Sequence, residues 1–402
     1  MSIYRSIYHG VYGADGSIYG DDFVGGISWD EGTDVYTRLG ALAGYPLSAS
    51  PGGAVLPIHA QMARCIVNDL GTIQYMLDAV DSTKKADGTA AVLDGTAGQV
   101  MVRVPKFWWK YSYAAPIHSW LISDRPRAGY TVHPAFIKAG FEVDYRYIGA
   151  YEACLDGTKL CSVSGQLPQT AKTRANFRGY AAARGTGWHQ QDLYLYSAIQ
   201  LLYLIEYADF NTQSMIGAGL TDWASATWDT YNSYYPINAT GLSNGLGNGS
   251  GSVSNGDGVV GSYMSYRGVE NWYGHIWKFV DGLNVHNSTA DRSRAFACGD
   301  HTAFADDTDT GYTLIGLLPE ADGYVKTILY GGLFLPQTTG GSSATYLCDN
   351  YYTYFDSDQA SGWRVVYWGG TANAGALAGA FFVSSNSGSS NASATLGGRL
   401  CF

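Results

Sequence analysis

Tyrosines and small polar residues dominate the part of the chain from about residue 345 to residue 402. Tyrosine gives a large contact area at a low entropic cost, and Ser, Thr and Asn supply adaptable hydrogen bonds. This composition resembles that of an antibody paratope, so it predicts noncovalent recognition of another molecule. The candidate ligand-binding residues are Tyr351, Tyr352, Tyr354, Asp356, Ser357, Tyr367, Thr371, Asn373, Ala374, Ala376, Ser384, Ser385, Asn386, Ser387, Gly388, Ser390, Asn391, Ala392, Ser393 and Thr395.

Two structural interpretations compete with this prediction, namely a tyrosine-rich exposed loop and a glycine- and serine-rich tail. A disordered tail is disfavoured because the segment finishes on Leu400, Cys401 and Phe402, which are residues of the kind that proteins bury.

Other residue types offer different chemistry. Glu270 and His275 can both transfer protons, but no nucleophile or third orienting group accompanies them, so catalysis is not expected. Carboxylates at Asp300, Asp306, Asp307 and Asp309 could bind calcium. Their spacing fits no calcium loop, so a solvated acidic turn is expected and no cofactor is predicted.

The six cysteines have irregular spacing and form no C-x-x-C pair, which argues against a zinc site or a disulfide framework. We expect reduced residues of the core, although Cys154 and Cys161 could instead close a small loop around Asp156–Thr158. The cysteines are Cys65, Cys154, Cys161, Cys298, Cys348 and Cys401.

The net charge of -10, with 24 Lys and Arg residues among 402, leaves no basic stripe for phosphate contacts. Binding to nucleic acid or to an anionic membrane is therefore not expected, and neutral partners such as glycans or protein loops are favoured.

No stretch approaches the roughly 20 apolar residues that span a bilayer. The segment Met1–Arg5 lacks the pattern of a Sec signal, so we expect a protein that stays in the cytoplasm or leaves in a virion released on lysis.

Periodicity predicts the elements that position these residues. Val100, Val102 and Val104 alternate with polar or long residues, which is typical of a half-buried strand. A second strand is predicted over residues 145–153 and a helix over residues 170–183. A further helix begins after Asp192, a plausible N-cap, and runs to Tyr207 with apolar residues at helical spacing.

A frame of aromatic residues and glycines, Trp363–Gly370, precedes the small polar residues, which end in Gly397–Phe402. Each of the small residue types is a one- or two-base change at the adenines of an Asn codon. With the internal segment Tyr266–Gly274, these features resemble the target proteins of diversity-generating retroelements, whose C-terminal segment is rewritten at adenines.

The resemblance implies a C-type lectin fold of the formylglycine-generating type over residues 131–402, with the variable segment forming the ligand-binding face. It implies a structural role for the charges and aromatic residues of Arg267–Gly282 and for the frame. These scaffold residues are Arg267, Glu270, Trp272, Trp277, Asp281, Trp363, Trp368, Gly369, Gly370 and Arg399, with Trp272 and Trp277 beneath the ligand face. Buried charges among them are expected to be paired.

Formylglycine-generating enzymes work through two cysteines about five positions apart. Cys348 follows Gly340–Ser342, but Thr353 stands where the second cysteine would fall. The departure removes the thiol pair that would hold the metal, so the sequence predicts the fold without the enzyme.

The predicted class is therefore α+β, with a C-type lectin-like C-terminal domain preceded by small β-rich modules. We expect a trimerisation or virion-attachment module at 1–60, a β-rich intermediate domain at 61–130, and the lectin-like domain at 131–402 with a surface insertion at 242–262. The resemblance implies a homotrimeric phage receptor-binding protein at a tail-fibre tip, which contacts other virion proteins and a host-surface protein or glycan. Two alternatives stay open: a cell-surface-displayed or secreted ligand-binding protein of the same fold and, less favoured, a formylglycine-generating-type oxidase.

Overall fold

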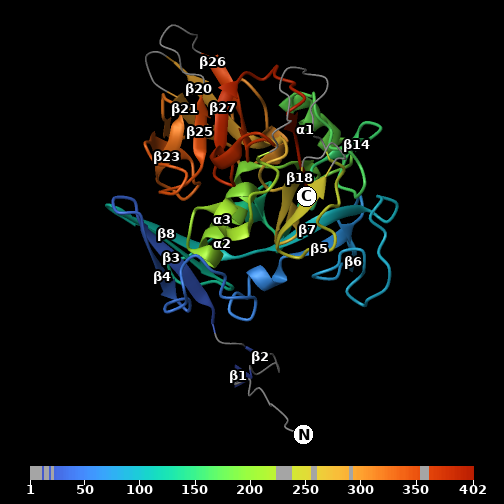
Figure 1. Ribbon diagram of the computed structural model, residues 1–402, viewed down its shortest axis with the longest axis horizontal. Coiled ribbons are helices and arrows are strands. Elements are labelled where there is room, and N and C mark those ends of the chain that lie inside the picture. The colour runs from blue at the N-terminus through green and yellow to red at the C-terminus, as the bar shows by residue number, and fades with distance from the viewer. Residues whose placement is uncertain are drawn as a thin grey trace.

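A computed structural model describes residues 11–12, 18–19, 22–222, 238–254, 260–288, 293–353 and 362–402. Strands outnumber helices throughout these ranges, and most strands belong to three larger sheets (Figure 1). The predicted α+β class is confirmed at this level. In the described part of the chain, no helix is both long and apolar enough to cross a membrane.

The five-stranded sheet joins the two N-terminal segments that were predicted to be separate modules. Its order is β10–β8–β9–β3–β4, and β3 pairs with β9 from Val24 opposite Ser123 to Asp30 opposite Ile117. The expected boundary at residue 60 therefore does not separate two sheets. The strands are Val24–Asp30 (β3), Val35–Gly40 (β4), Trp108–Ala114 (β8), Ile117–Ser123 (β9) and Thr131–Val132 (β10); ahead of them, Val11–Tyr12 (β1) pairs with Ile18–Tyr19 (β2).

The six-stranded sheet crosses the expected boundary at residue 130 in the same way. Its order is β16–β29–β13–β7–β5–β6, so a strand from the end of the chain lies between two strands from its middle. Leu400 and Cys401 are buried there, as predicted. The strands are Ala63–Val67 (β5), Ile73–Met76 (β6), Gln99–Pro105 (β7), Tyr145–Gly149 (β13), His189–Gln190 (β16) and Leu400–Cys401 (β29).

The prediction that Val100, Val102 and Val104 lie on a half-buried strand is wrong in one respect. These valines face the main core, but Met101 on the opposite face of β7 is also fully buried, in a second hydrophobic cluster. Strand β7 is buried on both faces because the chain packs against both sides of this sheet. The strand predicted over 145–153 ends earlier, at Gly149.

The helices follow the sequence closely. Helix α1 (Arg174–Ala182) is shorter than the predicted 170–183 and begins after Thr173, whose side chain accepts the N–H of Asn176. Helix α2 (Leu193–Tyr207) begins after Asp192 as predicted, with the N–H of Leu195 donating to the Asp192 carboxylate over 2.9 Å. A short helix that was not predicted, α3, spans Thr212–Ile216, and single 3₁₀ turns span His59–Gln61 (η1), Pro134–Phe136 (η2), His301–Ala303 (η3) and Gly375–Leu377 (η4).

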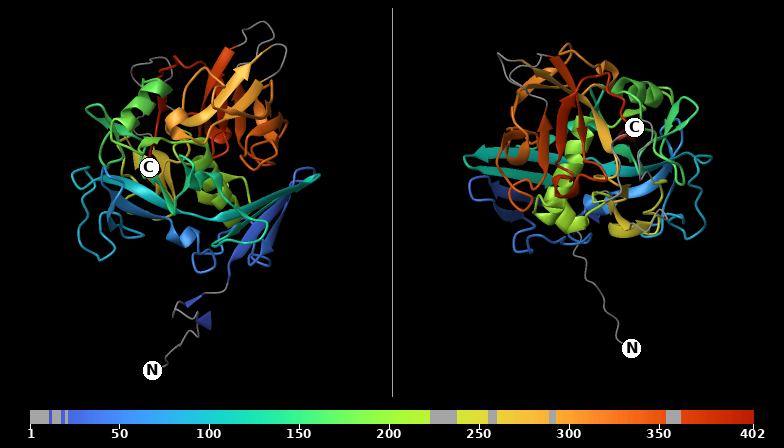
Figure 2. Two further views of the ribbon diagram at one scale, coloured as in Figure 1. Left: turned by 180° about the vertical axis from the view of Figure 1, so that it is seen from behind. Right: turned by 45° about the horizontal axis from the view of Figure 1, so that its top comes forward.

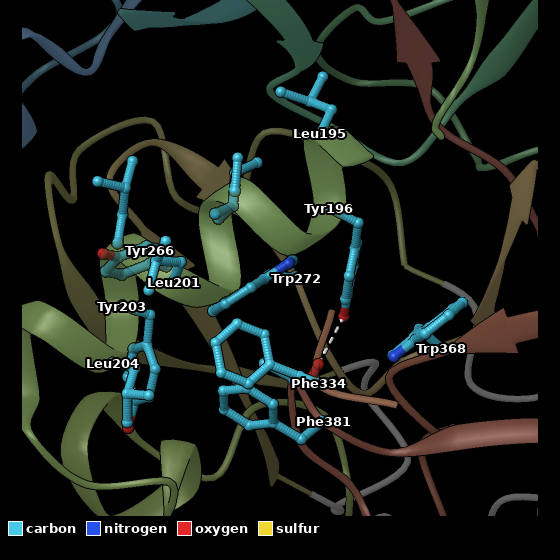
Figure 3. Close-up of a cluster of buried hydrophobic side chains, with 14 of the residues drawn as sticks. Leu195, Tyr196, Leu201, Tyr203, Leu204, Tyr266, Trp272, Phe334, Trp368 and Phe381 are labelled. Carbon is cyan, nitrogen blue, oxygen red and sulfur yellow. Dashed lines mark hydrogen bonds between the residues drawn. The ribbon is translucent and has the colours of Figure 1, made fainter. Parts of the chain in front are cut away.

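Helix α2 is the centre of the molecule, because it lies between the nine-stranded sheet and the five- and six-stranded sheets (Figures 1 and 2). Every α2 residue except Tyr194 is buried. Aromatic rings from distant segments surround it, including Trp272, Phe334 and Phe381 (Figure 3). The Tyr196 hydroxyl donates to the carbonyl of Ala380 over 3.0 Å, which satisfies a polar group inside this core.

The nine-stranded sheet carries the C-terminal segment. Its order is β22–β21–β20–β26–β27–β25–β23–β24, and β28 pairs in parallel with β20. The strands are Trp277–Asn287 (β20), Ser293–Ala297 (β21), Thr313–Leu318 (β22), Gly323–Ile328 (β23), Pro336–Thr339 (β24), Asn350–Thr353 (β25), Gly362–Trp368 (β26), Val383–Ser387 (β27) and Leu396–Gly397 (β28).

The low-complexity segment predicted as a surface insertion at 242–262 is anchored to the body by polar contacts; its residues 255–259 lie outside the described ranges. Ser243 is fully buried, and its hydroxyl accepts from Arg64 and donates to Glu270, both over 2.6 Å. Two buried charged side chains thus hold a segment that has few apolar groups. The remaining short strands are Gly249–Ser254 (β17), Val260–Tyr266 (β18), Val269–Glu270 (β19), Ile137–Lys138 (β11), Phe141–Glu142 (β12), Cys154–Asp156 (β14) and Lys159–Cys161 (β15).

Candidate ligand-binding site

The frame predicted from Trp363 to Gly370 forms strand β26 and the turn after it. Trp368 is fully buried, with its ring 5.3 Å from that of Tyr196 on α2. Gly369 and Gly370 follow with φ of 97° and 80°, a region that favours glycine. A Cβ on Gly370 would lie 2.8 Å from the Cβ of Ala378, so a side chain at this turn would displace its neighbours.

Beside this frame lies a groove of about 560 Å³. We use "the groove" for the cavity lined by Trp277, Asn350, Tyr352, Tyr367, Thr371, Asn373, Ala374, Leu377, Phe382, Asn386, Ser387, Asn391, Ser393, Thr395 and Leu396. Ten of these residues belong to the predicted ligand-binding set: Tyr352, Tyr367, Thr371, Asn373, Ala374, Asn386, Ser387, Asn391, Ser393 and Thr395. Its volume is within the range of small-molecule sites.

Aromatic side chains form the floor of the groove. The Trp277 ring packs edge-on against Phe382 with centroids 4.5 Å apart, and against Tyr367 at 5.0 Å. Trp277 was expected beneath the ligand face, and in the structure it lines the groove. Rigid rings of this kind supply contact area without much loss of conformational entropy on binding.

Hydroxyl and amide groups line the rim, and they are hydrogen-bonded to one another. The Tyr367 hydroxyl donates to the side-chain oxygen of Asn386, and Asn391 donates to the Ser387 hydroxyl over 2.7 Å. Across the groove, Thr371 donates to the Asn373 side chain over 3.1 Å. Such groups can both donate and accept, so they suit a polar ligand that also has an apolar surface.

Three predicted ligand-binding residues face the interior, and for these the prediction is wrong. Tyr351, Ser384 and Ser385 are fully buried. Strand β25 pairs in parallel with β27, and the Tyr351 hydroxyl meets the Ser385 hydroxyl at 2.7 Å inside the sheet. The small size of Ser384 and Ser385 therefore serves packing between strands.

The other predicted residues are distributed around the groove or fall outside the description. Ala376, Gly388, Ser390 and Ala392 are exposed or half-buried but do not line the groove. Tyr354, Asp356 and Ser357 lie outside the described residues.

Sequence reasoning missed four lining residues, Asn350, Leu377, Phe382 and Leu396. Asn350 precedes the predicted Tyr351 and Tyr352 and has the same polar, adaptable character, so its type was a usable signal. The apolar residues had no such signal, because a Phe or Leu of this segment is as readily assigned to the core.

The charged side chains among the predicted scaffold residues have ion-pair or hydrogen-bond partners. Arg267 pairs with Glu206 on α2, with its Nε donating over 3.0 Å, and Asp281 pairs with Arg178 at 2.7 Å. Glu270 instead accepts hydrogen bonds from the N–H groups of Gly241 and Ser243.

The two tryptophans of this segment occupy different layers. Trp272 stacks on Tyr266 at 5.1 Å in the core around α2, and the groove is lined by Trp277 alone of the pair. Trp363 packs against His286 at a ring distance of 4.7 Å.

His275 pairs with Glu152. Its Nδ1 lies 2.5 Å from the Glu152 carboxylate, and its Nε2 accepts the backbone N–H of Asn238 over 3.0 Å, so Nδ1 carries the proton. Lys278 binds the other oxygen of Glu152 at 2.8 Å. Burial raises the pKa of Glu152, but His275 and Lys278 outweigh burial and bring it down to about 2. This buried network ties the chain beneath the groove, since the His275 carbonyl accepts the N–H of Ala372.

Asp300, Asp306 and Asp307, three of the acidic residues considered for calcium, have separate partners. Asp306 accepts hydrogen bonds from Arg174 and Arg178, Asp300 accepts from the backbone of Thr302, and Asp307 accepts from Ser389. Within the described ranges, no group of three or more His, Cys, Asp or Glu residues could hold a metal ion. All six cysteines are free and buried, in agreement with the prediction of reduced core residues.

No protein-family model matches the chain, and no curated protein matches it. The case for a function therefore depends on the groove and its surroundings.

Proposed function

We propose that this chain is a receptor-binding adhesin of a phage or prophage, which recognises a protein or glycan of the host bacterial surface noncovalently through the groove. The observation that carries the proposal is the convergence of ten sequence-predicted residues on one groove with an aromatic floor. Residues from β25, β26, β27 and the loops after them meet there, although they were selected from the sequence without knowledge of the fold.

The chemistry of the lining supports reversible recognition. Amide and hydroxyl groups alternate with aromatic surface, and every side chain that lines the groove is uncharged. Such a surface exchanges hydrogen bonds with a neutral polar ligand and does not need to strip water from a buried charge.

A C-type lectin-like fold with a diversified face is part of the same proposal. Positions on the rim of the groove, such as Asn373 and Asn391, can change without disturbing the core, whereas Trp368, Gly370 and Arg399 cannot. A small face of this kind binds a surface strongly when several copies act together. A homotrimer at a tail-fibre tip, in contact with other virion proteins, would supply that multivalency.

The main alternative is a cell-surface-displayed or secreted ligand-binding protein with the same fold and groove. Genomic context separates the two: neighbouring tail genes favour the adhesin, whereas export or sortase genes favour cellular display. An oxidase of the formylglycine-generating type is a less favoured hypothesis, because Thr353 stands at the position of the second cysteine.

Binding of the labelled protein to a panel of bacterial strains tests the proposal. Tyr352 lines the groove with 41% of its surface exposed, so Tyr352→Ala should weaken binding to a recognised strain by about 30-fold, as at interface hot spots. Tyr330, 55% exposed and outside the groove, provides the matched control. Equal binding by Y352A and the wild-type protein, or equal losses in Y352A and Y330A, would show that the groove does not bind the receptor.

The diversification hypothesis has its own test in the surrounding DNA. We expect a near-copy of the codons for residues from about 345 to 402 beside a reverse-transcriptase gene, with mismatches almost only at adenines. If no such copy exists, the groove is a fixed surface and the tropism-switching mechanism is wrong.

A further inference from the structure

Two of the six cysteines lie directly opposite each other in a β-hairpin. Strands β14 and β15 are antiparallel, and their register pairs Cys154 with Cys161 three positions before the turn at Gly157 and Thr158. The hairpin packs beside α1 (Figure 1), and neither cysteine lines the groove. Nothing in the proposed adhesin function uses these thiols.

The geometry of this pair suits a disulfide bond. Directly opposite residues of an antiparallel pair have Cα atoms about 4.5 to 5.5 Å apart, which is inside the range of about 4.4 to 6.8 Å found in disulfides. The Cys154 thiol donates to the backbone carbonyl of Cys161 over 3.8 Å, which brings its sulfur atom close to the opposite cysteine. With Val163 they form a small cluster of their own, separate from the larger cores.

The pair is buried but can be reached. Cys154 and Cys161 are 4% and 3% exposed, and both line a cavity of about 630 Å³ with mainly polar walls. Arg184 lines the same cavity, where it is held by the carbonyl of Leu160 at 2.7 Å and by Asp69 at 2.6 Å. A small polar reagent can therefore approach the sulfur atoms through this cavity.

The surroundings make the two thiols unequal. The neighbouring Cys154 thiol and the positive charge of Arg184 lower the pKa of Cys161, whereas the neighbouring Cys161 thiol and burial raise the pKa of Cys154. A lowered pKa increases the thiolate fraction, and the thiolate is the nucleophile. Cys161 is thus suited to attack and Cys154 to resolve.

We propose that Cys154 and Cys161 form a redox-active dithiol whose oxidant is a small-molecule disulfide of the glutathione class. The Cys161 thiolate attacks one sulfur of that disulfide, forms a mixed disulfide and releases one thiolate. Cys154 then loses its proton to solvent, attacks the Cys161 sulfur and displaces the second thiol. One protein S–S bond replaces two protein thiols, and the small disulfide is reduced to two thiols.

The other four cysteines lack this arrangement. Cys65 lies opposite Met76 and Met101, and Cys401 lies opposite Ile148 and His189, so neither faces another cysteine in its sheet. Burial raises the pKa of Cys65 to about 12 and also raises the pKa of Cys298, Cys348 and Cys401. These thiols are expected to be inert in the folded protein.

Peptide mapping of the folded wild-type protein tests the proposal. The protein is incubated with glutathione disulfide, its remaining thiols are alkylated, and it is digested with trypsin without reduction. Trypsin cleaves after Lys159, so the predicted bond joins the peptide Tyr147–Lys159 to the peptide Leu160–Lys172. The oxidised protein should also melt at a higher temperature than the reduced protein, because the bond closes a loop in the unfolded chain.

Single variants test the two roles. Cys154→Ser should retain glutathione on Cys161 as a trapped mixed disulfide, whereas Cys161→Ser should leave Cys154 unmodified. Cys298→Ser, which changes a cysteine of similar burial outside the hairpin, should form the same linked peptides as the wild-type protein. Recovery of both hairpin peptides unlinked and alkylated, or linkage that forms only after unfolding in urea, overturns the proposal; adducts on Cys154 instead of Cys161 overturn the assignment of roles.

Discussion

Arg399 donates a 2.6 Å hydrogen bond to the backbone carbonyl of Glu270, which lies 129 positions earlier in the chain. The same guanidinium donates to the carbonyls of Asn271 and Gly149, and its side chain is almost fully buried. One side chain therefore connects the C-terminal segment to β13 and to the segment that leads into the groove floor.

Replacing Arg399 by Met should lower the free energy of unfolding by about 3 kcal/mol or more, because three buried carbonyls lose donors. Chemical denaturation measures the change. Lys84→Met, which breaks an exposed ion pair with Asp81 at 3.0 Å, should leave the midpoint of unfolding almost unchanged. Similar losses in R399M and K84M would contradict a structural role for Arg399.

Gly370→Ala should destabilise the protein by about 1 to 3 kcal/mol, because its φ is 80° and the new Cβ would meet Ala378. Gly388→Ala is the control, since no atom lies within 4 Å of its added Cβ, and the expected change is within about 0.5 kcal/mol. Thermal melts of both variants suffice. If Gly370→Ala melted at the same temperature as the wild-type protein, the turn after β26 would have to accommodate a side chain without strain.

Ser385→Tyr and Asn373→Tyr introduce the same side chain at a buried position and at an exposed one. Ser385 is fully buried beside Tyr351, so overpacking should cost about 1 to 3 kcal/mol of stability. Asn373 is exposed on the groove, so N373Y should keep the melting temperature and change binding to the recognised strain. The reverse pattern would contradict the assignment of Ser385 to the core and of Asn373 to the proposed binding surface.

The buried side chain of His59 should make the folded protein less stable in acid. Its Nε2 donates to the Leu202 carbonyl over 2.8 Å, and burial, opposed by Glu206 and assisted by Arg267, lowers its pKa to about 4. The unfolded pKa is about 6.5, so between these values the unfolded state binds more protons. Stability is therefore complete above about pH 6.5 and falls as the pH drops towards 4.

Urea denaturation at a series of pH values measures this dependence. His59→Gln keeps a donor for Leu202 but cannot be protonated. Its free energy of unfolding should therefore fall less steeply than that of the wild-type protein between pH 6.5 and pH 4, by at most about 1.4 kcal/mol per pH unit. His133 and His189, whose pKa values burial lowers to about 3 and about 4, keep the rest of the dependence. Parallel curves for H59Q and the wild-type protein across this range would refute the assignment.

The local elements could be predicted because their signals are local. The Asp192 N-cap and the apolar run after it define α2, and the glycines at 369 and 370 mark a turn that needs positive φ. The composition of the C-terminal segment likewise indicated most of the groove rim.

The pairing of strands could not be predicted, because it depends on partners far apart in the sequence. Strand β7 pairs with β5 and β13. Its alternating pattern predicts one buried face, but distant segments also cover the other face, where Met101 is buried. The domain boundaries at 60 and 130 failed for the same reason. Ser384 and Ser387 are identical in type, and only their neighbours in the sheet decide that the first is buried and the second lines the groove.

Strand β29 imposes an order on folding during synthesis. Its residues, Leu400 and Cys401, lie between β13 and β16, about 250 and 210 positions from their partners. Until residue 401 leaves the ribosome, β13 and β16 have no strand between them, and the facing edge of each is unpaired. The six-stranded sheet can therefore be completed only after translation of this region, and the newly made chain presents an open sheet edge that chaperones can shield.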